Sequence, residues 1–202
     1  MPRQFVDQFL RSPDETFVPL IRGTMHRVWH RPRWLAPIFR VLEKRGILVA
    51  SNGSSVPMTL TMIPCRSTAG RPFNTCARIF DFDSPASWNT FKTWDPRLNR
   101  VVEYMGRHQR LMVVLATGYE DASTLTFDTE RVALRVGGRR LWLPAWFWRT
   151  FMGATHFIQK ASADGRLIHV RLILTQSVLG EVFGYEGTFE ILRSDQIGAN
   201  AT

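Results

Sequence analysis

The chain has 202 residues, of which 45% are hydrophobic and 12% aromatic, so it can bury the apolar area that disordered chains lack. This length fits one domain, and we expect a single domain over residues 1–202. The formal net charge of +9 would suit nucleic acid, but the positive charge is almost all arginine and is scattered without a run of five or six like charges. We therefore expect no nucleic-acid partner.

Membrane and secretory segments are not predicted. No apolar run approaches the roughly 18 residues of a membrane span, and the first residues, from Met1 to Gln4, lead into mixed polar sequence without the apolar stretch of a signal peptide. We therefore expect a cytoplasmic protein without a transmembrane segment. The two cysteines, Cys65 and Cys76, form neither a secreted cysteine framework nor a CxxC pair.

The N-terminal part of the chain has helical apolar spacing. Residues 1–10 predict a short helix, and the apolar residues of 24–45 keep a helical rhythm that is interrupted at Pro32 and stops at Gly46. We expect these helices to pack one face on a sheet. A second aromatic block begins at Pro144 and predicts a short helix near 144–152, lying across the open end of the sheet.

From about residue 57 the pattern changes to a period near two, which is typical of half-buried strands. Residues 83–95 are interpreted as an irregular excursion or a bulged strand. Such a long antiparallel sheet must curl to hide its edges, so we predict an α+β fold with a half-barrel or barrel-like sheet. The clearer strand candidates are 57–65, 73–82, 99–105, 111–119, 124–128, 131–136, 155–161, 167–176 and 183–192.

Familiar cofactor and metal motifs are missing. The sequence has no GxGxxG after a strand, no P-loop, no HExxH, no GxSxG and no cysteine-histidine cluster with zinc spacing. His26 and His30 stand four residues apart, but a metal site normally needs at least three protein ligands. We therefore predict no cofactor and no metal.

Arg78 and Glu103 are candidate cavity residues. In 73–82 the alternate positions place Arg78 on one face with Phe80 and other aromatic or small residues. Glu103 lies in the apolar stretch 101–105, so either Glu103 or its neighbours must face the interior. One interpretation is a solvated salt bridge outside the core. The other is an internal pair with Arg78 at the floor of a pocket, able to orient a polar head group or to transfer a proton.

Tyr185 and Trp142 stand in two further aromatic segments. Gly184 and Gly187 flank Tyr185 and predict close backbone approach or a bulge, with the phenol either structural or directed at a partner. Trp142 opens the aromatic block 142–151, which could form a lid, a membrane-grazing helix or part of the core.

Several stretches together resemble the bacterial domain-of-unknown-function family DUF4166, over about residues 22–191. These stretches are 31–37, 53–57, 76–80, 101–103, 141–144 and 183–187. The Trp-x-Arg-x-Phe strand of that family has Cys76 in place of tryptophan here and keeps Arg78 and Phe80. Members stand alone or follow a saccharopine-dehydrogenase-like NAD-binding domain, so the resemblance implies an NAD-binding protein as a partner by analogy. It implies no reaction.

Three functions are compatible with the sequence. The first is binding of a lipophilic or aromatic small molecule in a pocket enclosed by the curled sheet, with Arg78, Glu103, Tyr185, Phe80 and Trp142 as contacts. The second is a cofactor-independent isomerase, cyclase or hydratase with Glu103 or Tyr185 as the catalytic group. The third is a module that binds a protein or a membrane surface through basic and tryptophan-rich segments. The sequence leaves open whether the protein is an enzyme.

Overall fold

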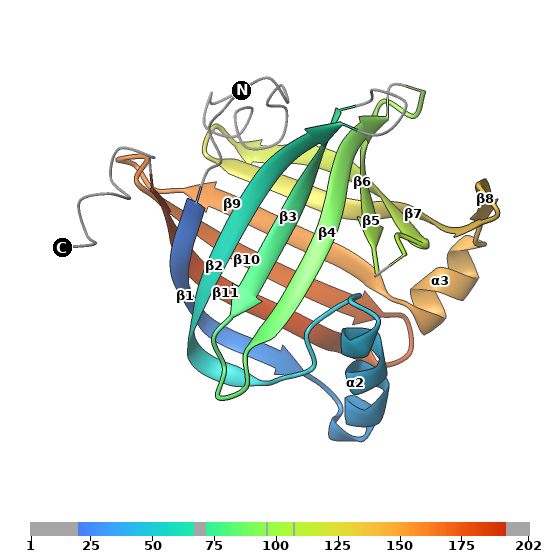
Figure 1. The fold of residues 1–202 in the computed structure, drawn as a ribbon, viewed down its shortest axis with the longest axis horizontal. Helices are drawn as coiled ribbons and strands as arrows, with labels where there is room; N and C mark the ends of the chain where they lie inside the picture. Colours follow the sequence, from blue (N-terminus) through green and yellow to red (C-terminus); the bar gives the residue numbers. More distant parts are fainter. Residues whose placement is uncertain (1–19, 67–71, 96, 107, 193–202) are drawn as a thin grey trace.

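One antiparallel sheet of eleven strands dominates the computed structural model, which describes residues 20–66, 72–95, 97–106 and 108–192 (Figure 1). The strand order is β6-β5-β4-β3-β2-β1-β11-β10-β9-β7-β8, and β6 also pairs with β7. This last pairing closes ten strands into a barrel and leaves β8 outside the ring. The strands are β1 (Leu20–His30), β2 (Gly53–Arg66), β3 (Pro72–Phe80), β4 (Ala86–Asp95), β5 (Arg100–Met105), β6 (Leu111–Asp121), β7 (Thr124–Val136), β8 (Arg139–Trp142), β9 (Ala154–Ala161), β10 (Leu167–Gln176) and β11 (Gly180–Leu192).

The connections make this an up-and-down barrel. Each ring strand pairs with its neighbours in the chain, except that β7 skips β8 to reach β9 and that β1 meets β11. Closure leaves the ring without a free edge, which is how antiparallel sheets of this size avoid unpaired backbone groups. The predicted barrel-like curling is therefore confirmed.

The predicted α+β class, with N-terminal helices packed on the sheet, is wrong. The helices among the described residues are η1 (Arg33–Leu35, a 3-10 turn), α2 (Ala36–Lys44) and α3 (Ala145–Phe151), so the fold is mostly β. The predicted helix at 1–10 lies outside the described residues. Within the predicted helical segment 24–45, the part up to His30 belongs to β1 and only Ala36–Lys44 is α-helical.

A β-bulge explains why the start of this segment resembled a helix. Ile21 and Met25 face the core of the barrel, and an irregularity between Met25 and Arg27 adds one residue to the strand. The next core position is therefore Val28, three residues after Met25, instead of two. A bulge thus converts the period of two into a step that imitates helical spacing.

The helices α2 and α3 lie at one end of the barrel (Figure 1). α2 has Pro37 in its first turn and ends before Gly46, whose φ of 70° is a left-handed conformation that glycine adopts without strain. α3 begins after Pro144, which confirms the short aromatic helix predicted near 144–152. Neither described helix combines the length and the apolar character needed to cross a membrane.

Apolar side chains fill the barrel and also cover part of its outside. Two buried clusters occupy the interior, one around Phe183 and one around Phe127. A third cluster, around Met112, packs under Trp142 of β8. The two cysteines, Cys65 and Cys76, are both free thiols on neighbouring strands.

Candidate ligand-binding cavity

The barrel interior contains a cavity of about 290 Å³. This volume is at the lower end of the range of about 300–1,000 Å³ that is typical of small-molecule sites. Its wall is mainly apolar and is formed by inward-facing strand residues together with residues of α2 and α3. The apolar and aromatic lining residues include Leu35, Phe39, Leu42, Leu48, Trp88, Met105, Leu111, Val113, Leu115, Phe127, Val132, Met152, Phe157, Leu172, Leu174, Val182 and Phe183.

A charged cluster, defined as Arg78, Lys92 and Glu103, lies in this cavity wall. Glu103 Oε1 lies 3.7 Å from Arg78 Nη2 and 3.7 Å from Lys92 Nζ, and all three side chains are about nine-tenths buried. The sheet register creates this grouping, because Lys92 of β4 stands directly opposite Glu103 of β5, and Arg78 lies on β3, the other neighbour of β4. Three consecutive strands thus each contribute one charge.

Thr90 and Trp88 of β4 hold the Arg78 side chain in place. Arg78 Nη1 donates a hydrogen bond of 3.1 Å to Thr90 Oγ1, and the guanidinium carbon lies 4.7 Å from the centre of the Trp88 ring. Lys92 Nζ lies 5.8 Å and 5.9 Å from the ring centres of Phe127 and Phe157. Both cations therefore also contact aromatic rings, which attract positive charge.

Burial and the neighbouring cations act in opposite directions on Glu103. Burial raises the pKa of the Glu103 carboxyl, but attraction to Lys92 and Arg78 and hydrogen bonding to Thr90 and Lys92 outweigh it and leave the pKa below its usual range. Glu103 is therefore an ionised carboxylate at neutral pH.

Tyr185 of β11 faces the charged cluster from the opposite wall of the barrel and also lines the cavity. Its ring makes edge contacts with Trp88, Phe80 and Phe157 at centre distances of 6.3, 6.5 and 6.4 Å. Burial raises the pKa of the Tyr185 phenol to about 12, although the positive charge of Arg78 opposes this effect. The phenol is therefore a neutral hydrogen-bonding group at neutral pH.

A second, smaller cavity of about 40 Å³ lies beyond the charged cluster. Arg78, Lys92, Phe157 and Tyr185 line both cavities and therefore form the partition between them. Gln159 lines the small cavity, and its Oε1 is buried without a hydrogen-bond partner among the described residues.

The main cavity meets the surface between α2 and α3. Ile38 of α2 and Phe151 of α3 both line the cavity, yet their side chains are 52% and 62% exposed. An apolar residue that is exposed and also lines an internal space stands at its entrance. We define this entrance, with Ile38 and Phe151, as the mouth.

Of the residues predicted to contact a ligand, the structure brings Arg78, Glu103 and Tyr185 to the cavity wall. Phe80 faces the interior, is fully buried and packs behind Tyr185. Trp142 does not reach the cavity, because β8 lies outside the ring and its ring packs on the outer cluster, with the Arg131 guanidinium 4.0 Å from its centre. The predicted contact role of Trp142 is not supported by this position.

The histidines on β1 are not arranged to share a metal ion. His26 Nε2 is exposed and pairs with Thr188 Oγ1 at 2.9 Å, whereas His30 is buried and stacks on Phe39. No group of three or more histidine, cysteine or acidic side chains that could hold a metal occurs within the part of the chain that the structure describes.

Comparison with known proteins identifies the family. The family model described as "Domain of unknown function (DUF4166)" matches residues 7–189. The chain belongs to the DUF4166 family. It is also similar to the "Uncharacterized protein YndH" of Bacillus subtilis (strain 168), with 24% identity over 158 residues that cover 76% of this chain and 75% of that protein. No solved structure matches the chain significantly.

Sequence reasoning missed Trp88 and Lys92, which line the DUF4166 cavity, and Thr90, which accepts a hydrogen bond from Arg78. All three lie on the inner face of β4, the segment interpreted as an irregular excursion or a bulged strand. β4 carries polar Thr90 and Lys92 toward the core beside the buried Trp88, at positions where an ordinary half-buried strand has apolar residues. The available signal was a run of alternate positions that begins with Trp88 and ends with Trp94 and has Thr90 and Lys92 between them.

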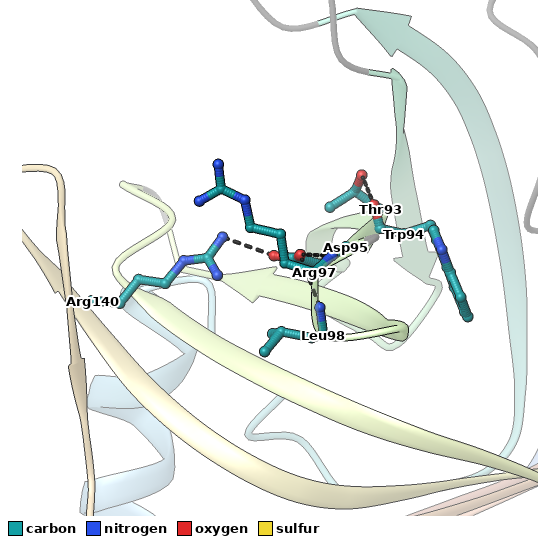
Figure 2. A network of polar contacts seen from close by, with 6 residues as sticks. All are labelled: Thr93, Trp94, Asp95, Arg97, Leu98 and Arg140. Carbon is teal, nitrogen blue, oxygen red and sulfur yellow. Dashed lines mark hydrogen bonds and ion pairs between the residues drawn. The ribbon is translucent and has the colours of Figure 1, made fainter.

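A second polar network in the DUF4166 domain is structural. Figure 2 shows the Asp95 carboxylate between Arg140 and the backbone of the β4–β5 turn. Its Oδ2 accepts a hydrogen bond of 2.9 Å from Arg140 Nη2, and its Oδ1 accepts bonds of 3.0 and 3.3 Å from the Arg97 and Leu98 amides. Burial raises the pKa of Asp95, but the hydrogen bond from Arg140 and those from the two amides outweigh it and lower the pKa. This network attaches β8 to the barrel wall.

Proposed function

We propose that this DUF4166 domain binds a small lipophilic or aromatic molecule inside the barrel. The observation that carries this proposal is the mainly apolar cavity of about 290 Å³ with a mouth between two short helices. Burying apolar ligand surface in such a space is favourable by roughly 25 cal/mol per Å². A bound ligand would also make van der Waals contacts with the lining side chains, which lack contact partners on the side that faces an empty cavity.

The polar groups of the cavity support a binding role. Ligand sites are typically apolar with a few converging polar groups that fix orientation. Here Arg78, Lys92, Glu103 and Tyr185 converge at the inner end of a space whose lining is mainly apolar. A core built for stability alone rarely keeps several ionised side chains, because desolvating them costs several kcal/mol per ion.

Titration with N-phenyl-1-naphthylamine, an uncharged dye that fluoresces in apolar surroundings, tests the proposal. The wild-type protein should bind this dye saturably. Val113→Trp, which places an indole in the cavity wall, should abolish binding. Val136→Trp makes the same change at a position that is 63% exposed and should leave binding unchanged. Equal binding to both variants, or no binding to the wild type, would refute the proposal.

Proton-transfer catalysis is less well supported by the same geometry. An effective general base has a pKa near the operating pH. Lys92 and Arg78 keep the pKa of Glu103 low, and burial raises the pKa of Tyr185 to about 12, so neither group is tuned for this task at neutral pH. Both groups remain suited to orienting a bound molecule.

A second candidate function, docking on an anionic membrane surface, rests on a separate observation. Apolar side chains are exposed on α3 and on the adjacent β10–β11 turn, and the Ser177 amide donates a hydrogen bond of 3.1 Å to the Arg149 carbonyl that joins the two segments. Arg149 is exposed beside these side chains and supplies charge complementary to acidic lipids. We name this surface the α3 patch, and it consists of Trp146, Phe147, Phe151, Val178 and Leu179.

Vesicle co-sedimentation tests the α3 patch. The protein should bind vesicles that contain phosphatidylglycerol more strongly than vesicles of phosphatidylcholine alone. Trp146→Ser combined with Phe151→Ser should weaken that binding, whereas Tyr119→Ser, which removes an exposed aromatic ring outside the patch, should not. Absence of binding to either vesicle would exclude membrane docking by this patch.

A further inference from the structure

The charges inside the barrel do not cancel. Arg78 and Lys92 contribute two positive charges and Glu103 contributes one negative charge, so the charged cluster carries a net charge of +1. Among the described residues that line either cavity, no other residue is acidic. A net charge held away from water is unfavourable unless a counter-charge approaches it. An anionic group in the cavity would supply that counter-charge.

The wall of the main cavity also holds a buried hydrogen-bond donor. The indole N–H of Trp88, which also lines the cavity, is buried without an acceptor among the described residues. An acceptor oxygen of a ligand in the cavity would satisfy this buried donor.

We propose that the ligand of this cavity is a lipophilic organic anion, in which an acid head group contacts Arg78 and Lys92 and an apolar body fills the rest of the space. This inference rests on the proposed function and narrows its ligand class. The orientation follows from the position of the charges. Arg78 and Lys92 lie at the inner end, where the partition separates the two cavities, whereas no charged residue lines the cavity at the mouth. The acid group therefore lies deepest and the apolar body extends toward α2 and α3.

Two dyes with the same naphthylamine framework test the inference. 1-Anilinonaphthalene-8-sulfonate is anionic and N-phenyl-1-naphthylamine is uncharged, so the ratio of their Kd values isolates the contribution of the acid group. For the wild-type protein we expect the anionic dye to bind at least about tenfold more tightly than the uncharged dye. Because buried charges are screened little by salt, this preference should persist in 0.5 M NaCl.

Charge variants assign the preference to the charged cluster. Lys92→Met removes one buried cation and keeps an unbranched side chain, so the preference should fall to within about threefold. Lys160→Met removes the same charge from an exposed site on β9 and should leave the preference unchanged. Glu103→Gln raises the net charge of the cluster to +2 and, in a variant shown to be folded by circular dichroism, should increase the preference.

The outcomes separate this inference from the proposed function. If both dyes bind equally, or if Lys160→Met lowers the preference as much as Lys92→Met, the anionic ligand class is wrong and the binding cavity stands. A preference that disappears in 0.5 M NaCl overturns the inference in the same way, because it reports the positive surface of the chain. If neither dye binds, the binding cavity itself is refuted, and the inference falls with it.

Discussion

Arg78 of β3 and Glu103 of β5 approach within 3.7 Å although β4 lies between their strands. The approach is possible because both side chains point into the barrel, where the curvature of the sheet brings inward-facing groups of alternate strands together. Thr90 and Lys92 of the intervening strand complete the contact from the same face. The pair therefore depends on barrel closure, and a flat sheet with the same register would separate it.

The charged cluster predicts an asymmetry between single and combined substitutions. Glu103→Ala leaves Arg78 and Lys92 buried without their carboxylate and should lower the free energy of unfolding by about 3–5 kcal/mol. The triple variant Arg78→Met, Lys92→Met and Glu103→Leu removes every charge and should be more stable than Glu103→Ala. Urea unfolding followed by circular dichroism measures both. A triple variant less stable than the single one would show that the ions contribute net stability.

Asp95 predicts a loss of stability in acid. Because the folded-state pKa of Asp95 is lowered, its contribution is complete above the pKa of the unfolded chain, about 3.9, and is lost as the pH falls through the lower folded-state pKa. Asp95→Asn keeps an acceptor for the turn amides but loses the charge opposite Arg140. We expect Asp95→Asn to lower the free energy of unfolding by about 0.5–1 kcal/mol at pH 7, a small effect because Arg140 is one-third exposed. The difference from the wild type should become smaller on acidification.

The control for Asp95 is Asp83→Asn, which removes a carboxylate of the same charge from an exposed position. The free energy of unfolding, measured with urea from pH 7 to pH 3, should change with pH in parallel for this control and the wild type. The curve of Asp95→Asn should converge on the wild-type curve as the pH falls. A constant difference in the free energy of unfolding between Asp95→Asn and the wild type over this pH range would mean that the charge of Asp95 does not contribute to stability.

Tyr185 predicts the opposite pH dependence at the alkaline end. Its folded-state pKa of about 12 exceeds the usual value of about 10, so the unfolded chain loses the phenolic proton first. Between pH 10 and pH 12 this group should therefore lower the free energy of unfolding by up to about 1.4 kcal/mol per pH unit. Tyr185→Phe should lack this decrease. From pH 7 to pH 9 the free energies of unfolding of Tyr185→Phe and the wild type should change in parallel. Identical slopes above pH 10 would contradict the assignment.

Strand alternation predicted most of the barrel, and the departures have identifiable causes. The inward positions of β3 followed from a period of two, which placed Arg78 and Phe80 on one face, and both are buried. β1 was interpreted as a helix because its bulge spaces Met25 and Val28 by three residues. The pairing of β1 with β11 could not be predicted, since it joins strands about 150 residues or more apart in the sequence and does not follow from a local pattern.

The candidate site was only partly predictable for a related reason. Lys92 and Thr90 point inward where an ordinary strand carries apolar residues, so the segment was interpreted as an irregular excursion or a bulged strand. Sites that bind ligands often break the local rules that specify a fold. Glu103 was ambiguous because its outward neighbours Val102 and Tyr104 are also shielded, under the cluster that Trp142 of β8 covers. A strand outside the ring thus shields the outer face of β5, so that the residues on both sides of Glu103 are apolar or aromatic.

Gly184 of β11 predicts a strong effect of a single added methyl group. Its two neighbours in space are the Trp29 ring and the Leu172 carbonyl, and a Cβ at residue 184 would lie 2.4 Å from Trp29 Cζ2 and 2.8 Å from Leu172 O. The Trp29 indole on β1 and the Leu172 backbone on β10 cannot easily move away, so Gly184→Ala should lower the free energy of unfolding by about 1–3 kcal/mol. Gly118→Ala, whose Cβ would meet only Thr126 Oγ1, which can rotate, should change stability by less than about 1 kcal/mol. Thermal unfolding measures both variants, and comparable losses would show that the close approach of Trp29 to Gly184 adds no specific cost.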